Sequence, residues 1–522
     1  MDVNSFLATL TNKHKITPVK TFENGADELY VETNQAGFGA FCLALHQELC
    51  SPVMAMFARD LDDKFQIYCA FMNFQTQTWV FVTMKILKTE PEFKSIALQI
   101  YSANLFEREI KEMFGLHHLG NPDNRRLHLH EEVWPQGFYP LRHDFIPPNN
   151  EPSSAEYEFS LVEGEGVFEV PVGPVHAGII APGHFRFSVA GEPIINLEIR
   201  LGFTHRGVEK LLENKTPLEC LKISECVAGD SAFAHSWAFC CALEKINRIN
   251  VPDKAVNIRM ILLELERMYN HVADLGGIAL DVGFSPAQAL SAIIKESIHV
   301  LNEKLTGSRF LKGVNVVGGV AKDLDFTAGK RIVDSLIQIR RDFKELETIL
   351  MSSVSFLDRV DTTGVLRKKT AQDLGVYGLA GRAAGIKIDT RKGFMPCYDQ
   401  VDFKLCSSAS GDALSRLKVR MEEFSQSVNI ICQLTEKLDN GKIVADDINI
   451  KPGFALGCVE GWRGPVLYWV NLNDVGKIDR VKIVDPSFRS WQGLAYAVLG
   501  EIIPDFPLCN KSFNLSYPGR DL

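Results

Sequence analysis

Residues 223–237 read ISECVAGDSAFAHSW and bring several reactive side-chain types together within a long apolar region. Glu225 and Asp230 supply carboxylates, Cys226 a thiol and Ser231 a hydroxyl group. Thiolates and carboxylates at close spacing are common metal ligands, and carboxylates near a histidine also occur in sites that move protons. A tightly packed helix whose polar groups satisfy one another is the plain alternative. The choice decides whether this chain does redox chemistry itself.

Twelve cysteines are spread along the 522 residues, and no two of them form a C-x-x-C pair. This spacing gives no zinc or iron–sulfur pattern, so any bound metal would need ligands from distant segments. In a long cytosolic chain we expect buried, reduced thiols that pack as small apolar residues. The same interpretation applies to the Cys240–Cys241 pair, His235 and His271, which have apolar neighbours on predicted helices.

Motifs for nucleotide and nucleic-acid chemistry are missing from the sequence. There is no Walker phosphate loop, no G-x-G-x-x-G between a strand and a helix, and no H-E-x-x-H pattern. The formal net charge of −9 and the pI near 5.9 argue against a protein that binds a phosphate backbone. Neither a nucleotide-dependent enzyme nor a nucleic-acid partner is expected.

The elements that must position these residues divide into two units. Residues 144–159 concentrate proline, asparagine and serine, which is typical of an exposed linker. Short strand-like runs and one short helix precede this linker, whereas most of the chain after it has helical apolar spacing. The predicted division is an α+β domain at 1–147, a linker at 148–164 and a mainly α-helical domain with small flanking β-sheets at 165–522.

Particular segments carry these predictions. Strands are expected at 64–74 and 78–86 in the first unit and, in the second, at 166–173, 184–192, 465–472 and 480–484. Helices are expected at 103–113, 216–250, 255–276, 287–305, 328–356 and 413–438. We expect the charged helix at 103–113 to present a solvated face rather than a docking surface, because runs of charge are commonly exposed.

Membrane and export signals are also missing. The N-terminal residues lack a basic segment followed by an apolar one, so no signal peptide is expected. No apolar run approaches the roughly 20 residues that a membrane helix needs. The chain is therefore predicted to be cytoplasmic, with any membrane association made through partners.

A series of longer strings runs through the chain in a fixed order. The first unit carries A-N-L-F-E-R-E-I-K-E-M-F-G-L (103–116), G-N-P-D-N-R-R-L (120–127) and P-L-R-H-D-F (140–145). The second carries G-P-V-H-A-G (173–178), P-G-H-F-R-F (182–187), G-F-T-H-R-G-V-E-K (202–210), L-L-E-L-E-R-M-Y-N-H (262–271), F-L-D-R-V (356–360), R-M-E-E-F (420–424), R-V-K-I-V-D-P-S-F (480–488) and S-F-N-L-S-Y-P-G-R-D-L (512–522).

Taken together, these strings resemble two modules of respiratory complex I over most of the chain. The first unit resembles the 30 kDa-type subunit with its F-E-R-E and R-R strings. The second resembles the 49 kDa-type, quinone-site subunit and its relative, the large subunit of membrane-bound [NiFe] hydrogenases. The fused order is most similar to the large subunit of formate-hydrogenlyase-type hydrogenases.

The hydrogenase relatives hold nickel and iron with four cysteine thiolates, because soft sulfur donors suit and bridge these metals. Counting from F-A-H-S (233–236), two of the family positions fall on Ala228 and Ser231. The other two fall on Ser516 and Gly519. The resemblance therefore implies a chain without its own metal centre, which is not an active hydrogenase.

The histidine and tyrosine that contact the quinone headgroup in complex I are also replaced at the matching positions. Of the two histidines in the family's G-P-x-H-P-x-x-H, His176 matches the first and Ile180 the second position. The tyrosine position falls on Gly229, or on Asp230 if the register slips by one. The resemblance implies NAD and quinone binding for the family's complexes, but a quinone is disfavoured at this site.

Several polar residues are expected to converge on the cavity that, in the family, holds the metal centre or the quinone. The candidates for proton handling are His176, His184, Arg186, Glu225 and Asp230, and those for the former cofactor cavity are Ser231, Ser516 and Tyr517. Buried carboxylates are costly without partners, so an arginine or histidine is expected beside them. The alternative is that these are satisfied structural groups inherited from an ancestor.

The resemblance implies the peripheral-arm large subunit of a complex I-like, hydrogenase-related oxidoreductase that couples electron transfer to ion translocation. Expected partners are a small subunit with a [4Fe–4S] cluster, a quinone-chamber-type membrane subunit and antiporter-like subunits. The expected location is the cytoplasmic face of the inner membrane, as a peripheral subunit. The alternative is a non-redox scaffold that links ion-transporting membrane subunits.

Overall fold

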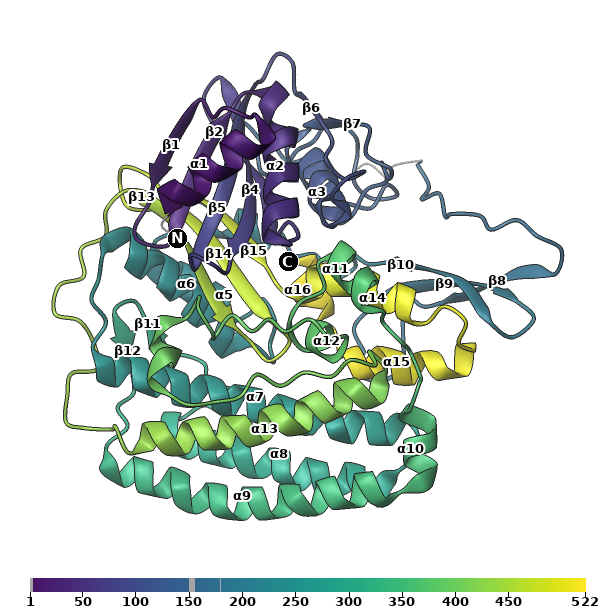
Figure 1. The fold of residues 1–522 in the computed structure, drawn as a ribbon, viewed down its shortest axis with the longest axis vertical. Coiled ribbons are helices and arrows are strands. Elements are labelled where there is room, and N and C mark those ends of the chain that lie inside the picture. The colour runs from purple at the N-terminus through teal and green to yellow at the C-terminus, as the bar shows by residue number, and fades with distance from the viewer. Residues whose placement is uncertain (1–2, 150–154, 179) are drawn as a thin grey trace.

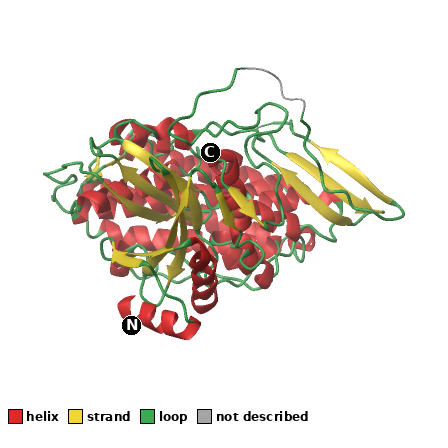
Figure 2. Cartoon of the chain, turned by 90° about the horizontal axis from the view of Figure 1, so that it is seen from above, coloured by secondary structure: helices red, strands yellow, loops and turns green. Residues whose placement is uncertain are grey.

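The computed structural model describes residues 3–149, 155–178 and 180–522. In Figure 1 a sheet built by the N-terminal region lies above a second sheet from the C-terminal region, and long helices form the opposite side of the molecule. A third, smaller sheet projects from the flank, as Figure 2 also shows. The predicted order of a β-rich N-terminal region and a mainly helical C-terminal region is confirmed. The domain limits at 147 and 164 remain a prediction.

Residues 3–87 form a five-stranded sheet and two helices. Its elements are α1 (Val3–His14), β1 (Lys20–Glu23), β2 (Glu28–Thr33), α2 (Gln35–Leu49), β3 (Ala55–Asp60), β4 (Lys64–Asn73) and β5 (Thr78–Leu87). The strand order is β1-β2-β5-β4-β3, with β2 and β5 parallel and the other neighbours antiparallel. The two predicted strands at 64–74 and 78–86 are confirmed as β4 and β5. Both are almost wholly buried, since α2 packs on them.

The charged helix of the first unit, α3 (Asn104–Phe114), is buried, so the prediction of a solvated face was wrong. Its carboxylates have specific partners instead of water. Glu107 accepts hydrogen bonds from Ser95 and from the backbone of residue 96. Glu109 lies 2.6 Å from the ammonium group of Lys482, which belongs to the C-terminal region. The helix is therefore a docking surface between the two regions.

Four long helices build the helical side of the molecule. They are α7 (Asp253–Asp281), α8 (Ser285–Thr306), α9 (Phe326–Ser352) and α13 (Ala413–Thr435). The apolar stripe predicted on α7 is buried, with Ile258, Leu262 and Leu265 fully inaccessible. The helix predicted at 328–356 is divided, because Ser353 leaves the helical conformation and caps α10 (Val354–Val360).

Shorter elements connect these layers. The helices are η1 (Tyr101–Ala103), α4 (Val208–Leu212), α5 (Pro217–Ser224), α6 (Ala232–Asn247), α11 (Lys368–Leu374), α12 (Gly378–Ala383), η2 (Pro396–Gln400), α14 (Ser487–Ala497), η3 (Ile503–Asp505), α15 (Phe506–Phe513) and α16 (Tyr517–Asp521). The strands are β6 (Glu92–Lys94), β7 (His117–Leu119), β8 (Val167–Val172), β9 (His184–Ala190), β10 (Ile194–Arg200), β11 (Asn315–Val316), β12 (Gly319–Val320), β13 (Gly453–Glu460), β14 (Pro465–Leu472) and β15 (Ile478–Val484).

The two predicted units share one apolar core. Antiparallel β13, β14 and β15 lie against the N-terminal sheet, and the Trp469 ring packs 4.8 Å from Phe57 and 5.0 Å from Tyr68 between ring centroids. A buried carboxylate joins the same layers, since Glu28 accepts a 2.7 Å hydrogen bond from the backbone of Leu456. The N-terminal unit is thus packed into the second rather than tethered beside it.

Within the described residues, no helix is both long enough and apolar enough to cross a bilayer.

Candidate functional site

The segment 223–237 is not one continuous helix, contrary to the prediction over 216–250. Helix α5 starts at a capping box formed by Thr216 and Glu219 and ends before Glu225, and α6 starts after Ser231. The seven residues between them, including Gly229, form a turn, because glycine, aspartate and serine favour turns over helix interiors. The reactive residues therefore lie on a turn that opens toward the C-terminal region.

Asp230 has the arginine partner that its partial burial demands. Arg463 donates to both carboxylate oxygens at 2.8 and 2.6 Å, and this guanidinium is buried whereas the Asp230 side chain is 40% exposed. The neighbouring Ser231 accepts a 3.1 Å hydrogen bond from the Trp462 indole. From α7, Asn270 donates to the Asp230 carbonyl at 2.7 Å. The Asp230–Ser231 end of the turn is thus held by Trp462 and Arg463 and by α7.

The same arginine connects this turn to the C-terminal string. Arg463 Nε donates to the carbonyl of Asn514 at 2.6 Å. Two residues further on, Ser516 caps α16 by accepting from the backbone of Gly519 at 3.0 Å. Asp230 and the C-terminal string at 512–522, which are distant in sequence, are therefore joined through one guanidinium group.

A buried histidine–aspartate pair lies next to the turn at 225–231 and the C-terminal string at 512–522. His235 Nε2 is 3.1 Å from Asp485 Oδ2, and its Nδ1 is 2.9 Å from the Tyr468 hydroxyl group. Burial alone would raise the pKa of Asp485, but the His235 hydrogen bond and the Arg463 charge hold it below its usual value. Gly519 lies against this carboxylate, since a Cβ there would be 2.8 Å from Asp485 Oδ2. His235 is a satisfied core histidine, as predicted, but it contacts the site.

The loop between β8 and β9 brings only some of the predicted residues to this place. His176 contacts the carbonyl of Gly183 at 2.7 Å, and Gly183 in turn packs against the Tyr517 ring. The Tyr517 hydroxyl group is buried and makes no hydrogen bond of normal geometry within the described residues. Burial raises its pKa, and Asn510 nearby offsets part of this effect. Residue 179, beside the predicted quinone position Ile180, lies outside the described residues.

His184 and Arg186 lie on the other face of β9. Strand side chains alternate, and Phe185 lies on the face that packs against α14 and α15. His184 contacts the Phe159 ring at 5.1 Å between centroids, and Arg186 lies 3.7 Å above the same ring. Their place is therefore the projecting sheet, away from Asp230 in the direction of the linker.

Glu225 has a different environment from Asp230. Its carboxylate accepts a 2.6 Å hydrogen bond from the backbone of Gly313, and burial raises its pKa. The expected arginine or histidine partner is replaced by this backbone amide, with the Lys312 charge nearby. Glu225 therefore ties the turn to the segment that follows α8.

The residues at the four family ligand positions do not fit a metal bound by thiolates. They offer the methyl group of Ala228, the hydroxyl groups of Ser231 and Ser516, and no side chain at Gly519. Both hydroxyl groups already have hydrogen-bond partners. Within the described residues, no group of three or more His, Cys, Asp or Glu side chains is arranged to hold a metal ion. We therefore derive no chemical step through such a centre.

Sequence reasoning missed the residues that organise the site from a distance. Arg463 and Trp462 are part of the turn G-W-R-G between β13 and β14, and Asp485 follows β15. Arg463 lies 233 positions from its partner Asp230. The available signal was a glycine-flanked tryptophan–arginine pair immediately before the strand predicted at 465–472, which is a weak indication by itself.

The fold and the contacts made by Arg463 are those of one class of protein, a complex I-type large subunit whose 30 kDa and 49 kDa modules are fused in one chain. The family model for the 30 kDa subunit of respiratory-chain NADH dehydrogenase matches residues 31–151, and that for the 49 kDa subunit matches residues 281–455. Formate hydrogenlyase subunit 5 of Escherichia coli is 33% identical over 89% of this chain and 83% of its own length. The chain therefore belongs to the family of fused 30 kDa/49 kDa complex I-type and hydrogenase large subunits.

Two other relatives extend this assignment. A component of the NADH-quinone oxidoreductase of Phocaeicola vulgatus is 30% identical over 72% of this chain and 76% of its own length. A chain of the membrane-bound sulfane sulfur reductase, an archaeal respiratory membrane complex, superimposes with a TM-score of 0.64 and 26% identity. That match covers 69% of this chain and 99% of the other. The fold is thus shared by relatives named for different reactions.

Proposed function

We propose that this chain is the peripheral-arm large subunit of a membrane-bound, complex I-like, hydrogenase-related complex that couples electron transfer to ion translocation without a [NiFe] centre of its own. Support comes from the relatives, which are components of membrane-bound hydrogenase and NADH-quinone oxidoreductase complexes. No specific observation favours the alternative of a non-redox scaffold.

The observation that carries the proposal is the link made by Arg463. One guanidinium group, that of Arg463, joins the turn at 225–231 to the C-terminal string at 512–522. It binds Asp230 on one side and the carbonyl of Asn514 on the other. A partly exposed carboxylate against a buried arginine can change its pairing when a nearby charge changes. We assign Asp230 the coupling role and Glu225 the anchoring of the turn.

The partners follow from the same family. The chain would dock to a small subunit holding a [4Fe–4S] cluster, which would deliver electrons, and to a quinone-chamber-type membrane subunit beside antiporter-like subunits. The complex would place this subunit on the cytoplasmic face of the inner membrane. Tyr517, with its buried hydroxyl group, would line the cavity beside Gly183 and His176. The projecting sheet with His184 and Arg186 would lie at the rim.

Asp230→Asn in the intact complex tests the coupling role. The change keeps the shape and one acceptor oxygen but removes the negative charge that pairs with Arg463. Electron transfer or ion translocation should fall by roughly a hundredfold or more, in the range of lost proton-transfer catalysis. Glu225→Gln is tested in parallel, and Asp446→Asn, at an exposed carboxylate paired with Lys442, serves as control. Rates equal to the control in both variants would remove the proposed role.

A further inference from the structure

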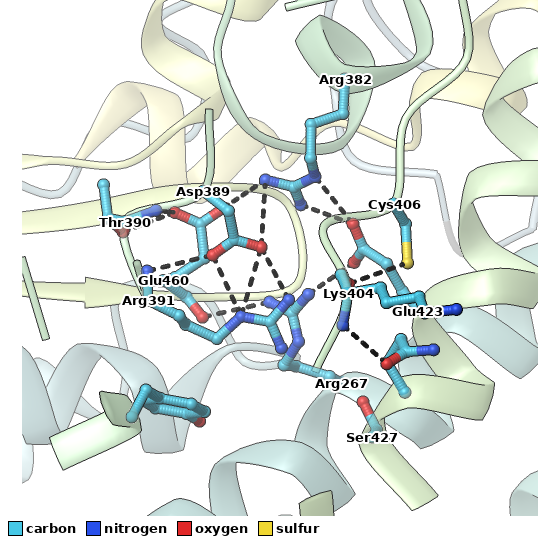
Figure 3. A network of polar contacts seen from close by, with 12 residues as sticks. Arg267, Arg382, Asp389, Thr390, Arg391, Lys404, Cys406, Glu423, Ser427 and Glu460 are labelled. Carbon is cyan, nitrogen blue, oxygen red and sulfur yellow. Dashed lines mark hydrogen bonds and ion pairs between the residues drawn. The ribbon is translucent and has the colours of Figure 1, made fainter. Parts of the chain in front are cut away.

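A dense cluster of charges lies in the interior of the protein, and Figure 3 shows most of its members. Every one of its charged side chains is at most 2% exposed. The cations are Arg267 from α7, Arg382 from α12 and Arg391 from the following loop, and the carboxylates are Glu264 from α7, Asp389 from that loop, Glu423 from α13 and Glu460 from β13. We call these seven residues the buried charge cluster.

Hydrogen bonds form two groups within the cluster, and ion pairs of 3.5 Å (Arg267–Glu264) and 3.8 Å (Arg382–Asp389) join these groups into one unit. Arg382 bridges Glu423, at 2.8 Å from Nε, and Glu460, at 2.7 Å from Nη1. Arg391 bridges Asp389 at 2.7 Å and Glu264 at 3.0 Å. Because each guanidinium serves two carboxylates, a change of charge at one carboxylate affects the others.

The charges of the cluster do not balance. Three guanidinium groups face four carboxylates, which leaves one excess negative charge if all are ionised. An uncompensated charge in a dry interior is costly, so one bound proton is expected there. His271 offers one position, since its Nε2 lies 3.1 Å from Glu423. Burial lowers the pKa of His271, however, so the imidazole is kept neutral.

The other titratable groups around the cluster do not supply the missing charge. Tyr398 from η2 donates to Glu264 at 2.7 Å, and burial raises its pKa far above neutrality. Burial likewise raises the pKa of Cys406 to about 12 and that of Cys458 on β13 still further. Arg420 of α13 is already paired with Asp274 at 2.7 Å. The proton must therefore be on one of the four carboxylates.

Glu460 has the weakest cationic environment of the four. Among the described residues its one ionic partner is Arg382, and its second oxygen accepts a 2.6 Å hydrogen bond from the Thr390 hydroxyl group. Glu423, by contrast, lies between Arg267 and Arg382. Burial, followed by the charge of Asp389, raises the pKa of Glu460, whereas the guanidinium groups outweigh burial and lower that of Glu423.

Helix α7 and the turn at 460–464 connect the buried charge cluster to the Asp230–Arg463 pair. Glu264, Arg267 and His271 follow a helical spacing and face the cluster, whereas the adjacent face of α7 presents Asn270 to the Asp230 carbonyl. Arg267 also donates to the carbonyls of Glu460 and Gly461 at 3.1 and 2.7 Å. The next two residues of that turn are Trp462 and Arg463, the partners of Ser231 and Asp230.

We propose that the buried charge cluster is a one-proton store, with the proton on Glu460, that is coupled to the Asp230–Arg463 pair through Arg267 and the 460–464 turn. Release breaks the O–H bond of the Glu460 carboxyl group, gives H⁺ to Asp230 or to water at that half-exposed group, and moves no electron. Because coupling is reciprocal, the charge at Asp230 and the proton affinity of Glu460 alter one another by the same factor.

Infrared spectroscopy of the purified full-length chain tests whether Glu460 carries the one stored proton. At pH 7 the carbonyl-stretch band of protonated carboxyl groups should lose one equivalent in Glu460→Gln, which replaces one neutral group by another and should fold normally. Glu244→Gln, at a buried carboxylate that binds Arg259 through two hydrogen bonds, is the matched control and should leave that band unchanged. An unchanged band in Glu460→Gln, or its failure to fold at pH 7, overturns the proposal.

The coupling is tested by titrating the same band. In the wild type the Glu460 signal should disappear as the pH rises through the folded-state pKa. Asp230→Asn should shift this midpoint, and Asp446→Asn should not. An identical midpoint in Asp230→Asn overturns the coupling. The coupling rests on the proposed role of Asp230, whereas the presence of a stored proton on Glu460 does not. If Asp230→Asn lowers the activity of the complex but neither infrared effect is seen, the proposed function stands and the proton store is wrong.

Discussion

At the scale of single residues, the site depends on close backbone approach as much as on charge. Asp485 is held by His235 and by the backbone of Ser487, so its carboxylate has little freedom to move. Gly519 lies directly against it, and a Cβ there would also be 2.9 Å from Ser516 Oγ. The absence of a side chain at position 519 is thus part of the packing around Asp485, independent of any ancestral metal.

This packing predicts the effect of a methyl group. Gly519→Ala should lower the free energy of unfolding by about 1–3 kcal/mol, because overpacking displaces a hydrogen-bonded carboxylate. Gly229→Ala, in the turn at 225–231, is the control, since its Cβ would meet no atom of the described residues within 4 Å. Urea unfolding measures both. Equal stability of the two variants would show that Asp485 yields easily and would contradict the account of the site.

Single residues also mark what sequence could and could not predict. The requirement for an arginine or histidine beside Asp230 follows from the cost of a partly buried charge, and the structure confirms it. The identity of Arg463 does not follow, because it comes from a turn 233 positions away. For Glu225 the same reasoning predicted a charged partner, but a backbone amide from Gly313 supplies the main hydrogen bond.

At the scale of elements, periodicity predicted the long helices and the central strands, and it failed where tertiary contacts decide. The apolar spacing of 216–250 continues through the turn at 225–231, so the break between α5 and α6 is invisible to it. The charged helix α3 carries a pattern typical of an exposed face, yet it is buried because its carboxylates have partners from distant segments. Charge alone does not distinguish solvent from a docking partner.

The docking of α3 predicts a large effect at Lys482 on β15. Lys482→Met leaves Glu109 buried without its ammonium partner and also removes a 3.2 Å contact with Glu209. We expect a loss of about 3–5 kcal/mol in the free energy of unfolding. The second change Glu109→Gln should recover part of it. Lys442→Met, at an exposed i,i+4 pair, should cost no more than about 0.5 kcal/mol. A comparable cost for both lysines would contradict the buried docking surface.

At the scale of the whole molecule, the two modules form one body. The N-terminal sheet shares its core with β13–β15, and Glu28 binds the backbone of Leu456 across the same contact. This continuity explains why composition revealed two units but not their packing: the linker is visible in sequence, whereas the shared core is not. The buried charge cluster combines residues from α7, β13 and α13, and Arg267 joins it to the turn that carries Arg463.

The central claim is that this family member functions in a membrane-bound redox complex without a metal centre of its own. The most direct measurement is the metal content of the purified, intact complex, with nickel and iron quantified per copy of this chain. We expect no stoichiometric nickel, and we expect the iron–sulfur clusters of the partner subunits to account for all of the iron. One nickel per chain, bound in the complex and lost on unfolding of this subunit, would contradict it.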